Sequence, residues 1–107
     1  MKDNYELRFI RLFYDDLREI TAYIRDQLNN PTAAYRLNEQ VEKAIKKRLS
    51  NPEAYEKFYS QRERALPYYR IYVKNYVIYY VVKQDETEKI MEVRRILYAG
   101  RNRNKLI

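Results

Sequence analysis

Apolar residues between positions 13 and 49 recur at intervals of three and four, which predicts two amphipathic helices. The first helix is predicted to end near Leu28. The second begins at Asn30 and Pro31, because asparagine caps a helix and proline suits its first turn. The short link predicts an antiparallel hairpin whose apolar stripes share one cover. The stripes are Phe13, Leu17, Ile20, Ile24 and Leu28, then Ala34, Leu37, Val41, Ala44 or Ile45, and Leu49.

Near both ends of the chain the apolar period changes to two, which predicts strands. Residues 5–10 form a short N-terminal strand in this interpretation. Residues 69–73 alternate, and residues 76–82 are apolar or aromatic throughout, as in a central strand. Between them, Lys74 and Asn75 predict a tight hairpin in which asparagine tolerates a positive φ. Residues 84–88 predict a looser turn.

The last predicted strand covers residues 90–98 and is interrupted by Arg94 and Arg95. Gly100 ends the regular structure. Together the elements predict a single α+β domain over residues 1–107, with a helical hairpin on a three-stranded antiparallel sheet. We expect all pairing to be antiparallel and cationic groups to lie on the face away from the helices. On the last strand, alternation places Met91, Val93 and Leu97 on one side and Ile90, Ile96 and Tyr98 on the other.

The charge balance favours an acidic or polyanionic partner. The chain has 22 Lys and Arg against 15 Asp and Glu, for a net charge of +7 at pH 7. It has no cysteine and no histidine, which removes thiolate nucleophiles and the commonest bases and metal ligands, so we expect no metal and no cofactor. With no secretory apolar segment or membrane-length run, we expect a cytoplasmic protein without membrane contact.

The order of the elements, together with several local strings, resembles the RelE/ParE toxins of type II toxin-antitoxin systems, also known as plasmid stabilisation proteins. The resemblance covers nearly the whole chain. It implies a growth-inhibiting toxin that is neutralised by a cognate acidic antitoxin. The strings are Asp16-Leu17-Arg18-Glu19-Ile20 with Tyr23-Ile24, Asn51-Pro52, Tyr69-Arg70-Ile71, Asn75-Tyr76-Val77-Ile78-Tyr79-Tyr80, and Arg95-Ile96-Leu97-Tyr98 before Arg101.

The resemblance leaves two targets open, since RelE-like members cut messenger RNA in the ribosome and ParE-like members poison DNA gyrase. RelE-like nucleases carry an arginine after the central-strand tyrosine, where this chain has Val77. Tyr98 stands where many relatives have histidine, and Arg101 matches a late arginine. We therefore favour ParE-like gyrase poisoning, with a RelE-like endoribonuclease and a degenerate, non-catalytic binding module as the alternatives. Whether the chain is an enzyme depends on this choice.

The candidate site residues are cationic or aromatic. For an RNase, the catalytic candidates are Arg101, Tyr98 and Arg70, because guanidinium groups stabilise phosphate charge and tyrosine can stack on a base. Candidates for binding nucleic acid or another target are Arg94, Arg95, Arg103, Lys105 and Tyr80.

Structural interpretations compete with these functional ones. Tyrosines on a sheet usually pack in the core or against the neighbouring strand. Arg70, Arg94 and Arg95 could form cross-strand ion pairs with Glu88 or Glu92. Two further charged groups are interpreted as surface features. Asp15, Asp16 and Glu19 indicate ordinary surface pairing on the first helix. The cluster of Lys43, Lys46, Lys47 and Arg48 indicates a solvated helix end or, alternatively, a nucleic-acid stripe.

Overall fold

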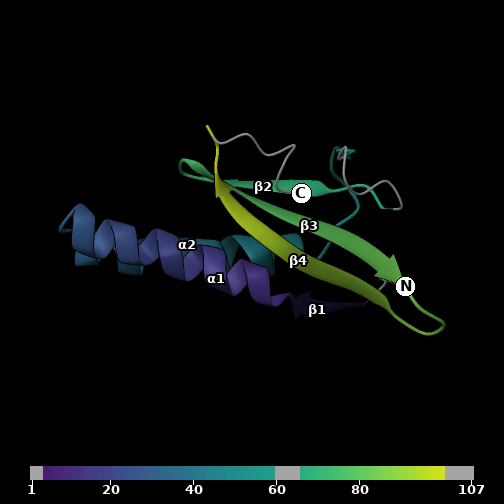
Figure 1. Cartoon of the computed structure of the whole chain (residues 1–107). Coiled ribbons are helices and arrows are strands. Elements are labelled where there is room, and N and C mark those ends of the chain that lie inside the picture. The colour runs from purple at the N-terminus through teal and green to yellow at the C-terminus, as the bar shows by residue number, and fades with distance from the viewer. Residues whose placement is uncertain (1–3, 60–65, 101–107) are drawn as a thin grey trace.

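The computed structural model describes residues 4–59 and 66–100. Within these ranges the order is one strand, a helical hairpin and three strands, which confirms the α+β class (Figure 1). The strands are β1 (Tyr5–Phe9), β2 (Tyr69–Val73), β3 (Tyr76–Gln84) and β4 (Lys89–Tyr98). The helices are α1 (Arg11–Ala22), its continuation η1 (Tyr23–Gln27) and α2 (Pro31–Arg48).

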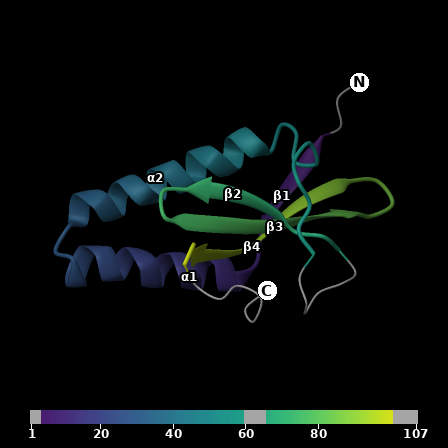
Figure 2. The same cartoon turned by 90° about the horizontal axis from the view of Figure 1, so that it is seen from above.

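The helical hairpin forms where the sequence predicts it. The first helix ends in a π-helical turn, η1, and α2 begins after Asn30, whose side-chain oxygen accepts a hydrogen bond from the Ala33 amide at 3.1 Å. The two helices run antiparallel and lie on the same side of the sheet (Figures 1 and 2). The expected burial of Leu28 is wrong, because its side chain is 56% exposed beyond the last turn of η1.

The four strands form one sheet in the order β1-β4-β3-β2. As predicted, β2, β3 and β4 pair antiparallel. The expectation of antiparallel pairing throughout is wrong at the edge, because β1 pairs parallel with β4. These two strands are far apart in sequence, so no tight turn forces their direction, and the connection between them, which runs through the helical hairpin, β2 and β3, is long enough for parallel pairing.

The β2–β3 turn is tight, as predicted, but the residue with positive φ is Lys74 (54°) and not Asn75. The looser turn before β4 is closed by the Asp85 side chain, which accepts hydrogen bonds from the amides of Thr87 and Glu88. This side chain therefore satisfies backbone groups that a two-residue turn would leave in solvent.

A bulge in β4 changes which side chains share a face. Tyr80 pairs with Val93 and Tyr79 with Arg95, so Arg94 is an extra residue between the two pairs. Beyond the bulge Ile96 joins the helix-side core, whereas Leu97 lies in the cluster on the other face. The expected grouping of Leu97 with Met91 and Val93 is therefore wrong.

The two faces of the sheet carry different side chains. The face under the helices holds the main core, in which Phe13, Leu37 and Val41 pack against strand residues such as Ile78 and Met91. We call the opposite side the outer face. It carries a smaller apolar cluster, formed by Tyr68, Val77, Tyr79, Val81 and Leu97 with Phe58 and Leu66 packed against them. Helices of the described chain are too short or too polar to cross a membrane.

Candidate functional site on the outer face of the sheet

The structure separates the sequence-predicted site residues into several places. Arg70 and Arg94 lie on the outer face, Arg95 faces α1, Tyr80 lies in the main core and Tyr98 ends β4. Three further candidates, Arg101, Arg103 and Lys105, lie outside the described residues. Among the candidates that the structure describes, only Arg70 and Arg94 are thus brought to a common surface.

Arg70 and Arg94 flank a group of aromatic rings. The Arg70 guanidinium lies 4.7 Å from the centre of the Phe58 ring, and that of Arg94 lies 5.8 Å from the centre of the Tyr68 ring. Tyr79 packs between these rings, with ring centres 6.5 Å from Phe58 and 6.2 Å from Tyr68. The arrangement therefore combines two cations with aromatic surface, which favours cation–π contact.

Phe58 is held at this place by the backbone. It pairs with Tyr68 through two hydrogen bonds of 2.7 and 2.6 Å, so the segment after α2 runs across to the start of β2. Sequence analysis missed both residues. One signal was available: the stretch between α2 and β2 is long for a connection, and long connections inside compact domains are often functional.

Each of the two guanidinium groups forms an ion pair with a carboxylate. Arg70 Nη2 lies 3.1 Å from Glu56 Oε1, and Arg94 Nε lies 2.8 Å from Glu92 Oε1. The Glu56 side chain is 84% exposed, whereas that of Glu92 is 12% exposed and is also bound by Lys83 at 3.1 Å. The pair at Arg70 is therefore open to exchange with solvent anions, and the pair at Arg94 is part of the fold.

The pKa values at the Arg94 pair follow from its surroundings. Burial alone would raise the pKa of Glu92, but hydrogen bonds from Arg94 and Lys83 outweigh it and lower that pKa. Burial would likewise lower the pKa of Arg94, but hydrogen bonds to Tyr68 and Glu92 raise it. Both side chains consequently stay charged near neutral pH. Arg94 does pair with Glu92, but the two belong to one strand, so the interpretation of a cross-strand ion pair is wrong for Arg94.

Arg95 has a structural partner that the sequence interpretation did not assign. Its Nε and Nη2 atoms lie 2.7 and 2.8 Å from the two carboxylate oxygens of Asp16 in α1, and this ion pair raises the pKa of Arg95. Asp16 also accepts the Ile96 amide at 3.1 Å, just past the end of the β1–β4 pairing. The interpretation of Asp16 as ordinary surface pairing is wrong, while Asp15 does pair with Arg18 on α1.

Tyr80 is fully buried, so its ring has no exposed surface for a base. Its hydroxyl donates to the Pro52 carbonyl at 2.6 Å and accepts from Arg48 at 2.9 Å, and burial raises the pKa of Tyr80 to about 12. The Arg48 guanidinium lies 3.4 Å from the centre of the Tyr55 ring. These contacts fix the segment after α2 and turn Arg48 away from the solvated helix end.

The remaining two positions decide how the outer face can act. Tyr98 is 55% exposed and packs edge-on against Tyr76, with ring centres 6.0 Å apart. Val77, at the position where RelE-like nucleases carry an arginine, is 1% exposed in the outer-face cluster. The arginine missing from the sequence is therefore replaced by a sealed apolar contact.

A family comparison agrees with this fold. The family model described as ParE toxin of type II toxin-antitoxin system, parDE, matches residues 7–103. The chain belongs to this family. It is therefore the toxin of a type II toxin-antitoxin system, and it has a cognate antitoxin as its partner. No curated protein matches the chain.

For this toxin, the outer face supplies binding groups more readily than proton-transfer groups. Guanidinium groups hold carboxylates or phosphates, and exposed aromatic surface stacks on planar groups. Arg94 is committed to Glu92, and Arg70 is held by the exposed Glu56. The described part of the outer face thus resembles a recognition surface with Arg70 as its exchangeable cation.

Proposed function

We propose that this toxin inhibits growth by binding and poisoning DNA gyrase, and that its cognate antitoxin prevents this binding. The observation that carries the proposal is the burial of Val77 in the outer-face cluster. A ribonuclease of the RelE type needs a cation near this point of the central strand to stabilise the phosphorane. A toxin that acts by binding has no such requirement.

The dispersal of the candidate residues supports the same proposal. Arg95 is bound to Asp16, Tyr80 is buried and Tyr98 lies at the C-terminal end of β4, beyond the outer-face pair of Glu92 and Arg94 in its middle. General acid–base catalysis needs its groups within hydrogen-bond reach of one substrate. Binding can instead use residues spread over a surface.

The decisive experiment is a supercoiling assay with purified gyrase, relaxed plasmid and the toxin. We expect loss of supercoiling and accumulation of gyrase-linked, cleaved DNA, with both reversed by the cognate antitoxin. The Val41→Asp variant, in which a charge enters the main core, provides a control protein whose native fold is strongly destabilised. Unaltered supercoiling at large toxin excess would overturn the proposal.

The cationic tail is a further part of the proposed target-binding surface, through Arg101, Arg103 and Lys105. Replacing Arg101 with alanine should reduce toxicity in cells and leave the unfolding midpoint of the purified protein nearly unchanged. Growth inhibition is the readout, and a urea titration is the stability control. Full toxicity of the variant would remove Arg101 from the proposed surface.

The second candidate function is ribosome-dependent cleavage of messenger RNA, favoured by the paired cations and rings at Arg70 and Arg94. Its test is incubation of the toxin with programmed ribosomes, followed by mapping of transcript ends. Arg70→Gln should then abolish cleavage and Arg18→Gln, on the exposed side of α1, should not. Intact transcripts at high toxin excess exclude this candidate.

Normal growth of cells that express the toxin without its antitoxin would instead favour the third alternative, a degenerate toxin or binding module without activity.

A further inference from the structure

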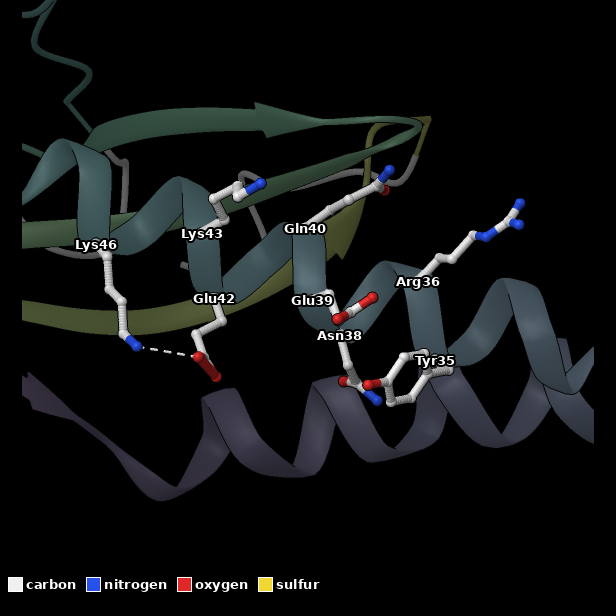
Figure 3. Close-up of a pocket in the computed structure, with 8 residues that line it drawn as sticks. All are labelled: Tyr35, Arg36, Asn38, Glu39, Gln40, Glu42, Lys43 and Lys46. Atoms are coloured by element: carbon white, nitrogen blue, oxygen red, sulfur yellow. Dashed lines mark hydrogen bonds and ion pairs between the residues drawn. The ribbon is translucent and has the colours of Figure 1, made fainter.

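Three cations on α2 lie in one line along the helix. Arg36, Lys43 and Lys47, together with Gln40, follow each other at intervals of three or four. With 3.6 residues per turn, all four positions fall within about 60° around the helix axis. We call this set of residues 36, 40, 43 and 47 the α2 stripe. Figure 3 shows Arg36, Gln40 and Lys43 extending from one side of α2, with Glu42 and Lys46 on another.

The cations of the stripe are free, in contrast to their neighbours on the same helix. Arg36, Lys43 and Lys47 are exposed and form no ion pair within the described ranges 4–59 and 66–100. Lys46 is paired with Glu42 at 3.0 Å (Figure 3), and Arg48 is turned inward against Tyr80. The packing thus separates the basic cluster seen in the sequence into paired, buried and free members.

A fourth cation extends the stripe from a different element. Lys74 lies at the tip of the β2–β3 hairpin, where its positive φ defines the tight turn, and it is exposed. It lines the same hollow of about 370 Å³ as Arg36 and Gln40. Two segments far apart in sequence therefore add unpaired positive charge to one side of the molecule.

The helix macrodipole does not explain this arrangement. Cations are favoured at the last turn of a helix, which accounts for Lys47, but the effect is confined to the terminal turns. Arg36 lies in the N-terminal half of α2, and Lys74 lies outside the helix. The only acidic residue flanking the stripe on its own helix side is Glu39, and it forms no ion pair in the described chain.

We infer that the α2 stripe, with Lys74, binds the phosphate backbone of duplex DNA without reading its sequence. Along the helix axis, Arg36 and Lys43 lie about 10.5 Å apart, and Lys43 and Lys47 lie about 6 Å apart. Duplex DNA carries one phosphate charge about every 1.7 Å along its own axis. Lysine and arginine are the usual phosphate contacts of DNA-binding proteins. A protein partner is less suited, because interface cores are apolar and depleted in lysine, and the stripe contains no apolar residue.

The choice of DNA over RNA rests on the proposed function, since a gyrase poison meets its target on DNA. Direct contact with the duplex would add to the hold of the toxin on the enzyme–DNA complex. The binding itself needs no gyrase and can be measured separately. Failure of the stripe and failure of gyrase poisoning are thus distinct results.

The test is fluorescence anisotropy of a labelled duplex of mixed sequence, titrated with the intact toxin at several salt concentrations. The variant replaces Arg36, Lys43 and Lys47 with glutamine. The control replaces Arg11, Arg18 and Arg25 of the first helix and its continuation η1 with glutamine. These three arginines are exposed, and their replacement removes the same net charge. Circular dichroism serves to check that both variants are folded.

Counterion release sets the expected size of the effect. Each phosphate contact adds about 0.9 to the slope of log affinity against log salt, so the stripe variant should lose about 2.7 of this slope. Between about 50 and 200 mM salt, the wild type should then lose roughly 40-fold more affinity than the stripe variant. The control should keep the wild-type slope.

Three outcomes of the DNA titrations would overturn the inference. They are absence of duplex binding by the wild type at low salt, equal salt slopes in the stripe and control variants, and preferential displacement of the duplex by RNA of the same length. A stripe variant that binds DNA normally but loses its antitoxin would assign the stripe to a protein partner, and this result would also overturn the inference.

Discussion

The two faces of the sheet are built from the same strands but carry different kinds of side chain. Under the helices, alternate residues of β2, β3 and β4 are largely apolar and buried, and the hydroxyl of Tyr80, which is buried among them, has both a donor and an acceptor as partners. On the outer face the alternate residues include Arg70, Glu92 and Arg94, supported by a smaller apolar cluster. Stability is thus concentrated on one face and recognition chemistry on the other.

The ion pairs extend this contrast. Asp16 and Arg95 join α1 to β4 with side chains 11% and 15% exposed, in a bidentate geometry. Arg70 and Glu56 on the outer face share a single contact, and Glu56 is open to solvent. A bidentate pair sheltered from water holds its geometry, whereas an exposed pair exchanges. The same residue type therefore serves the fold at position 95 and remains available for binding at position 70.

Placing a charge under the helices should have the largest effect. Val41 is 2% exposed, so Val41→Asp buries an unpaired carboxylate and should lower the free energy of unfolding by about 4 kcal/mol or more. Urea denaturation followed by circular dichroism measures the loss. The control is Tyr72→Asp on β2, which is 65% exposed and should cost within about 1 kcal/mol. Equal losses at the two sites would erase the distinction between the faces.

Removing the charge of Asp16 should have an intermediate effect. Asp16→Asn keeps the volume but weakens the contacts to Arg95 and the Ile96 amide, and it should cost about 2 kcal/mol of stability. Its neighbour Asp15 pairs with Arg18 at the surface, and Asp15→Asn should cost no more than about 0.5 kcal/mol. If the two variants unfold at the same urea concentration, the packing of α1 against β4 is not stabilised by the ion pair of Asp16 with Arg95.

The smallest effect concerns Glu92 and depends on pH. Its pKa is lower in the fold than in the unfolded chain, so its charge contributes stability above the unfolded pKa, and this contribution is lost as pH falls through the folded pKa. Glu92→Gln should therefore cost about 1–2 kcal/mol at neutral pH, and the difference from the wild type should shrink below about pH 4.5. Urea titrations across this range measure it.

Glu86→Gln provides the matched control for the pH series, because Glu86 is exposed in the turn before β4 and forms no ion pair in the part of the chain that is described. It should remain within about 0.5 kcal/mol of the wild type at every pH. A Glu92 variant whose deficit stays constant down to acid pH would show that packing, and not charge, is what the substitution removes.

The sequence alone was sufficient for the elements and the family. Hydrophobic periodicity places both helices and all four strands, because burial against a single layer imposes a period of 3.6 or 2 on the chain. The Asn30 cap and the tight β2–β3 hairpin were also predictable, since they depend on residues adjacent in sequence. The absence of histidine and cysteine from the sequence limits the chemistry that the chain can perform, whatever its fold.

Only the tertiary structure decided what depends on residues brought together from afar. The parallel pairing of β1 and the partner of Arg95 each join segments distant in the chain. The bulge at Arg94 depends on how β4 pairs with β3, and local periodicity carries no information about any of these three features. The same holds for the basic cluster of α2, where packing turned Arg48 inward and left Lys43 and Lys47 free. Charge is a property of the sequence, but its availability is set by the neighbours that folding provides.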